Sequence, residues 1–142
     1  MDLGIRGKRG LVCAASRGLG RGCAEALAEA GVNLVINARG REALTQTAWE
    51  IAERHQVEVT PVHGDITTEE GRAKVLEALG GQADILVTNA GGPPPGNWTE
   101  WSRDDFLRAF DGNLLPAVAL IQALVPGMME RGWGRVVNIT SQ

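Results

Sequence analysis

Cysteine and histidine are scarce in this chain of 142 residues, and each occurs only twice. Cys13 lies in an expected strand and Cys23 in an expected helix, and no further cysteine or histidine stands at metal-ligand spacing. These absences argue against a disulfide framework and predict no metal site. A reduced, cytoplasmic location is the simplest interpretation.

The chain also lacks an excess of positive charge, a leader sequence and a long apolar run. Its net charge of -3 gives nucleic acid no electrostatic reason to bind. The start "MDLGIRGKRG" has no apolar core, and no apolar run is expected to reach the length that crosses a bilayer. With 44% hydrophobic and 22% charged residues, the composition is that of one soluble globular domain.

Short apolar segments alternate with helical patterns along the whole chain. Such strands, apolar on both faces, predict an α/β fold with a doubly wound parallel sheet of about five strands covered by helices on each side. Strands are expected over 10–15, 32–38, 57–63, 84–89 and 135–141, and helices over 18–31, 42–55, 68–79 and 104–131, the last kinked or shortened by Pro116 and Pro126.

In a doubly wound sheet the ligand binds beyond the carboxyl ends of the strands. The first strand ends in a turn with Gly18 and Gly20, which lets the backbone approach a ligand and directs the N-terminus of the next helix at it. Ser16 and Arg17 add donors suited to anionic oxygen. This pattern favours a phosphate-binding turn, and a plain strand-to-helix turn is the alternative.

The second strand ends in Ala38 and Arg39, where an NAD site usually has an acidic residue for the ribose hydroxyls. An arginine there, together with Arg17, favours the 2′-phosphate of NADP over NAD. The alternative is that both arginines are ordinary surface residues. A methyltransferase would also have a glycine turn, but it should carry an acidic residue at this strand end, so we consider it less favoured.

At this point the chain resembles the short-chain dehydrogenases/reductases, and most closely their 3-oxoacyl-[acyl-carrier-protein] reductase branch, with its Rossmann-type fold. The glycine motif T-G-x-x-x-G-x-G resembles residues 13–20, and the family's D-[VI] resembles Asp65-Ile66. Its N-N-A-G motif resembles residues 88–91, "DGNL" carries the family's asparagine at Asn113, and "GRVVNITS" resembles the strand that delivers the catalytic serine, Ser141.

The resemblance implies an NADP-dependent oxidoreductase that transfers hydride between nicotinamide and a ketone or alcohol, acyl thioesters included, and that forms a homodimer or homotetramer. Ser141 would hydrogen-bond the substrate carbonyl, and Asn113 would hold a water of the proton relay. Without the resemblance, Asn113 would be expected to bond the helix backbone. The implied cofactor-binding residues are Ala14, Ser16, Arg17, Gly18, Leu19, Gly20, Arg39, Asp65, Ile66, Asn89, Ala90 and Gly91.

Three departures from the family pattern keep another interpretation open. The family's acid is a tyrosine in a Y-x-x-x-K motif beyond the serine strand, and this sequence contains no tyrosine. Ala14 replaces the first glycine of the glycine motif, and Thr88 replaces the first asparagine of N-N-A-G. We therefore expect residues 1–142 to be one dinucleotide-binding domain that lacks its C-terminal part and is inactive alone. A non-catalytic nucleotide-binding module or redox-sensing pseudoenzyme is the alternative.

A loop with three prolines, Trp98 and Trp101 follows the fourth strand. The two indoles could form a wall of an apolar substrate pocket, or they could pack on the next helix as a lid or subunit contact. The following helix is apolar over residues 113–129, wider than a one-sided stripe, so burial of a second face in an oligomer is expected.

Overall fold

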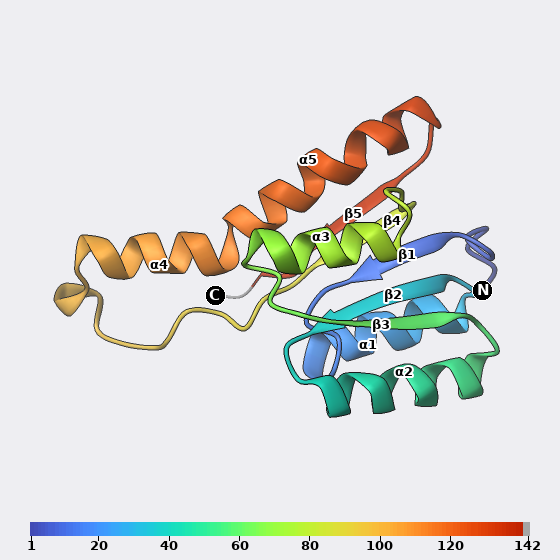
Figure 1. The fold of residues 1–142 in the computed structure, drawn as a ribbon, viewed down its shortest axis with the longest axis horizontal. Coiled ribbons are helices and arrows are strands. Elements are labelled where there is room, and N and C mark those ends of the chain that lie inside the picture. Colours follow the sequence, from blue (N-terminus) through green and yellow to red (C-terminus); the bar gives the residue numbers. More distant parts are fainter. Residues whose placement is uncertain (141–142) are drawn as a thin grey trace.

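A parallel sheet forms the centre of the computed structural model, which describes residues 1–140 (Figure 1). Its five strands follow the order β3-β2-β1-β4-β5, and every neighbouring pair is parallel. The doubly wound α/β fold is thus confirmed. The strands are β1 (Arg9–Val12), β2 (Asn33–Ala38), β3 (Val59–His63), β4 (Ile85–Thr88) and β5 (Arg135–Asn138).

Helices cover both faces of this sheet, because the chain reverses its direction of travel between β3 and β4. Helices α1 (Gly18–Glu29) and α2 (Arg41–His55) lie below the sheet in Figure 1, and α3 (Glu69–Ala78) and α5 (Leu115–Glu130) lie above it. Each face has its own core of buried aliphatic side chains, one against α1 and α2 and the other against α3 and α5. The reversal places the switch point between β1 and β4, where such sheets bind ligands.

The helical segment before β5 differs from the single helix that the sequence predicted. It consists of α4 (Arg103–Asn113) and α5, with a break at Leu114. Pro116 lies in the first turn of α5, a position where its missing N–H costs nothing. Pro126 lies inside α5 without ending it. The other expected helices and strands are present, with ends shifted by at most three residues.

The expectation that no apolar segment is long enough to cross a bilayer was wrong. The helical run Arg103–Glu130 contains an 18-residue window with mean hydropathy 1.5, which suffices by length and composition. A core helix of a soluble protein passes the same test. In α5 the side chains of Pro116, Leu120, Leu124 and Met128 are buried, so this helix owes part of its hydropathy to core packing.

Helix α4 has no buried residue and extends past the carboxyl ends of the strands, together with the loop that precedes it (Figure 1). That loop contains a short 3-10 helix, η1 (Trp98–Glu100). Ser102 and Asp105 form a capping box that begins α4. The carboxyl end of the sheet is therefore open, and α4 projects beside it.

Candidate functional site

The turn between β1 and α1 leaves the N-terminus of α1 open. Arg17 occupies the N-cap position with extended backbone, its side chain makes no cap hydrogen bond, and the first turn carries no acidic residue. By contrast, Thr68 caps α3, and Ser102 caps α4. The N–H groups at the start of α1 are therefore available to an anionic ligand, as a phosphate-binding turn requires.

This turn needs two unusual backbone conformations and one bare Cα. Ala14 has φ 49° and Gly18 has φ 57°, both in the left-handed region. A Cβ on Gly20 would lie 2.2 Å from the carbonyl oxygen of Ala14 and 2.9 Å from Nδ2 of Asn89. Gly20 therefore lets the turn close against the loop that follows β4.

Arg39 and Asp65 follow β2 and β3 at the same edge of the sheet. Arg39 is exposed. The backbone N–H and the hydroxyl of Thr67 both donate to Oδ1 of Asp65, at 2.9 and 2.8 Å. These bonds hold the pKa of Asp65 below its usual value against the opposing effect of burial, and the charge of Arg39 lowers it further. Asp65 is thus a carboxylate at neutral pH, next to a cation.

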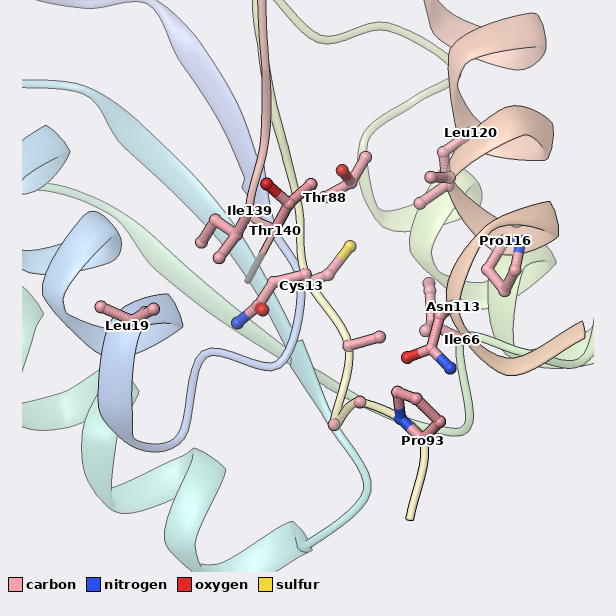
Figure 2. A pocket seen from close by; sticks show the side chains of 15 residues that line it. Cys13, Leu19, Ile66, Thr88, Pro93, Asn113, Pro116, Leu120, Ile139 and Thr140 are labelled. Atoms are coloured by element: carbon pink, nitrogen blue, oxygen red, sulfur yellow. The ribbon is translucent and has the colours of Figure 1, made fainter. Parts of the chain in front are cut away.

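A cavity of about 380 Å³ opens between these strand ends and the α4–α5 junction. Figure 2 shows Leu19 on one side, Ile66, Pro93 and Asn113 on the other, and Cys13 and Thr140 between them. Six predicted site residues line this cavity: Leu19, Ile66, Asn89, Ala90, Gly91 and Asn113.

The remaining predicted residues lie around the cavity and not in its wall. Those of the glycine turn (Ala14, Ser16, Arg17, Gly18 and Gly20), together with Arg39 and Asp65, occupy the adjoining strand ends. Ser141 lies outside the described residues, and its neighbour Thr140 lines the cavity. The structure thus brings the predicted residues that follow four strands together at the carboxyl end of the sheet.

Asn113 makes the helix-backbone bond considered for it from the sequence and also lies at the cavity. Its Nδ2 donates to the carbonyl of Ala109, four residues earlier, at 2.9 Å, which is a structural bond at the end of α4. The residue also lines the cavity beside Pro116. Neither Trp98 nor Trp101 lines this cavity. Of the two alternatives considered for the indoles, packing on the next helix is seen for Trp101, which contacts Phe106 of α4. Both indoles remain exposed at the start of α4.

Cys13 lines the cavity, although the sequence predicted only a core position for it. Its side chain is 1% exposed and still contributes to the lining. Burial raises the pKa of its thiol to about 12, and a hydrogen bond with the backbone N–H of Asn89 opposes this effect. The thiol is therefore neutral and a poor nucleophile. The signal that could have placed Cys13 at the cavity was its position directly after β1.

The protein-family model described as short chain dehydrogenase matches residues 8–142 of the chain. The chain belongs to the short-chain dehydrogenase family. The resemblance drawn from the motifs is thereby confirmed, and relatives of the chain include a 3-oxoacyl-[acyl-carrier-protein] reductase. The fold of this family binds a nicotinamide cofactor at the sheet edge described above.

The relatives and solved structures that resemble the chain include different kinds of oxidoreductase. The chain is 34% identical over 143 residues to the uncharacterized oxidoreductase YvaG of Bacillus subtilis, covering all of this chain and 54% of that protein. It is 33% identical to the 3-oxoacyl-[acyl-carrier-protein] reductase FabG of Aquifex aeolicus, covering 99% and 58%. L-sorbose reductase from Gluconobacter frateurii, solved with NADPH and L-sorbose, superposes with a TM-score of 0.90 at 35% identity, covering 97% and 54%. The chain spans about half the length of the curated relatives it matches.

Against the family's motifs, the chain's departures have visible structural consequences. Ala14, at the position of a motif glycine, adopts the left-handed conformation that a glycine would adopt freely. Thr88, at the position of a motif asparagine, is buried, and its hydroxyl donates to Oδ1 of Asn138 at 2.6 Å. The first departure costs conformational energy, whereas the second keeps β4 bonded to β5.

Proposed function

We propose that the protein is an NADP-dependent carbonyl reductase or alcohol dehydrogenase that resembles the 3-oxoacyl-[acyl-carrier-protein] reductases. The observation that carries the proposal is the set of groups at the carboxyl end of the sheet. There the open N-terminus of α1, the exposed Arg39 after β2 and the cavity after β4 lie on neighbouring strand ends.

The residues present fit this cofactor. The start of α1, with Ser16 and Arg17, would hold the pyrophosphate, and the bare Cα of Gly20 lets this turn close against Ala14 and Asn89. Arg39 would pair with the 2′-phosphate, since a guanidinium binds phosphate through two parallel hydrogen bonds. Asp65 and Ile66 would hold the adenine, and residues 89–91 would follow the ribose. NADPH, when bound, supplies the hydride.

On the substrate side, Ser141 would donate to the carbonyl oxygen, where negative charge develops. Asn113 would hold a water that supplies a proton to the site. The substrate class is a ketone or the corresponding alcohol, with 3-oxoacyl thioesters as one candidate. Support comes from the names of the relatives, one a 3-oxoacyl reductase and another a reductase of the ketose L-sorbose.

Cofactor preference tests this proposal at Arg39. The purified chain should bind NADPH more tightly than NADH in a fluorescence titration. R39A should weaken NADPH about tenfold or more and leave NADH unchanged, because only NADPH loses a charge-assisted pair. R103A is the matched control, an equal charge change on an exposed arginine at the start of α4. Equal binding of both cofactors by the parent chain would contradict the NADP assignment.

One observation favours a second candidate, a nucleotide-binding module without hydride transfer. Ala14 keeps a strained conformation in the phosphate turn, where the family's motif has a glycine. A panel of β-keto esters and ketoses, offered with NADPH to the complete gene product, separates the two. Turnover of any carbonyl supports the enzyme, and tight NADPH binding without turnover supports the module.

We also propose that the protein assembles as a homodimer or homotetramer. The support is an exposed apolar stripe along α4 and the start of α5, where Phe106, Phe110, Leu114 and Val118 recur every four residues. Such stripes on helices are usually covered by a partner.

A further inference from the structure

Asn37 is a buried polar residue that no role proposed above uses. It lies in β2, one residue before its end, and its side chain is 2% exposed. Asparagine is depleted in strands, whereas the neighbouring positions of β2 hold Val35, Ile36 and Ala38. An amide at this point of a buried strand indicates a specific hydrogen-bonding task.

That task is to fix the end of β3. Nδ2 of Asn37 donates to the carbonyl of Val62 at 2.9 Å and to the carbonyl of Gly64 at 3.1 Å. Val62 is its partner in the β2–β3 ladder, and Gly64 is the first residue beyond β3. Asn37 thus uses both hydrogens of its amide group to hold the last residues before Asp65.

The backbone of the same residue holds the glycine turn. The N–H of Ala15 donates to the carbonyl of Asn37 at 3.0 Å. In addition, the N–H of Gly64 donates to the carbonyl of Ala38 at 3.1 Å. Residues 37 and 38 therefore join the turn after β1 to the turn after β3, the two segments on either side of Arg39.

The far side of the Asp65 turn is fixed independently. The hydroxyl of Thr68 donates to the carbonyl of Asp65 at 2.8 Å, and a Cβ on Gly71 would lie 1.9 Å from that carbonyl oxygen. These contacts come from the start of α3. Without the amide of Asn37, β2 would hold this turn only through the bond from the N–H of Gly64 to the carbonyl of Ala38. The carbonyls of Val62 and Gly64 would each lose a partner in a half-buried place.

We propose that Asn37 is a positioning residue of the nucleotide site: its amide sets the path of residues 64–66 and thereby the place of Asp65 and Ile66 against the adenine. This inference rests on the proposed function for its ligand. Asn37 lines no part of the cavity, and the role proposed for it is to hold residues 64–66 in place.

The test compares two asparagines of the same strand. N37L keeps a similar volume and removes both donors. N33L is the matched control, because Oδ1 of Asn33 accepts from the N–H of Glu58 at 3.0 Å and so joins the same two strands at their opposite end. Both variants are studied at a temperature at which circular dichroism shows them fully folded.

Two readouts are expected to separate positioning from general stability. Hydrogen exchange at the amides of residues 64–68 should become faster in N37L and not in N33L. The Kd for 2′,5′-ADP should rise about fivefold to tenfold in N37L, as loss of two hydrogen bonds allows, and should stay at the parent value in N33L. An unchanged exchange rate in folded N37L would overturn the proposal.

The parent chain supplies a measurement that survives a failure of N37L to fold. The side-chain NH₂ resonances of Asn37 should exchange slowly and should shift on saturation with 2′,5′-ADP, while those of Asn33 stay in place. Resonances of Asn37 that exchange fast or ignore the ligand would refute the positioning role. Protected Asn37 resonances in a chain that binds neither 2′,5′-ADP nor NADPH would leave the local contact standing and would refute the proposed function.

Discussion

Ala14 shows how one residue can weaken a site without removing any contact. Its φ of 49° is a conformation that glycine adopts freely and that costs an L-residue about 1–2 kcal/mol. The residue lies two positions after the end of β1, and its carbonyl oxygen is the atom that Gly20 must clear. The strain therefore lies in the turn proposed to hold phosphate.

A14G should relieve this strain. We expect the free energy of unfolding to rise by about 1 kcal/mol, the gain from the left-handed conformation exceeding the added entropy of the unfolded chain. Urea denaturation measures this change, and an NADPH titration should show equal or tighter binding. A15G is the control: Ala15 is buried outside the left-handed region, so the same substitution should destabilise. A loss of stability in A14G would show that the turn does not need this conformation.

Residue types explain which parts of the site were accessible from the sequence. Gly18, Gly20 and Arg39 stand in a motif and at strand ends, where residue chemistry alone suggests a phosphate site. Asn37 and Cys13 act through hydrogen bonds to the backbone of residues 25 to 76 positions away. Such bonds depend on strand register and leave no local pattern. The left-handed φ of Ala14 was likewise visible only in the structure.

At the scale of elements, helix α1 offers a direct test of the close approach at its start. Beyond its first residue, Gly18, the helix contains Gly20 and Gly22, two residues apart. A Cβ on Gly20 would overlap the carbonyl of Ala14, whereas a Cβ on Gly22 would meet nothing within 4 Å. The same substitution at the two positions should therefore have opposite effects.

G20A should destabilise the chain by about 2 kcal/mol or more and abolish NADPH binding, because backbone must move to admit the methyl group. G22A should stabilise it by about 1 kcal/mol, the difference in helix propensity between glycine and alanine, and should leave binding intact. Thermal unfolding and an NADPH titration on both variants measure this contrast. Equal effects at the two positions would show that α1 does not pack on the turn as described.

Element boundaries follow the sequence closely wherever a residue with a strong preference marks them. Gly31 follows the end of α1 with φ 84°, and Thr68 caps α3 through its hydroxyl. The sequence predicted one helix kinked or shortened by Pro116 and Pro126, and the structure has a full break at Leu114, a residue whose own helix propensity is good. Its cause lies two residues later, in Pro116, which lacks an N–H and fits the first turn of a new helix.

At the scale of the whole molecule, α4 is the element whose exposed apolar side chains the fold of one chain explains least. No residue of this helix is buried, and Phe106 and Phe110 are each about half exposed. Trp101 packs its ring edge-on against Phe106, with 5.9 Å between centroids, so the aromatic surface is ordered before any partner arrives. Ordered aromatic side chains on a rigid helix are typical of interface anchors.

A second copy of the chain suits this surface better than a lipid bilayer does. Helix α4 carries charges of both signs, among them Arg108, which is paired with Asp105, and Asp111. Two α4 helices that cross at Phe110 would cover the apolar stripe of each and leave these charged side chains in water. Acidic residues outnumber basic ones along α4, which disfavours an anionic membrane.

We therefore expect a symmetric dimer that a single charge at the centre of the stripe dissociates. Sedimentation velocity should show the parent chain as a dimer and F110E as a folded monomer, because two carboxylates would face each other at the two-fold axis without a partner. W49E is the control, since Trp49 is an equally exposed aromatic residue on α2, away from the stripe. A parent chain that stays monomeric at all concentrations would refute the dimer, and one that sediments with phospholipid vesicles would assign the stripe to a membrane instead.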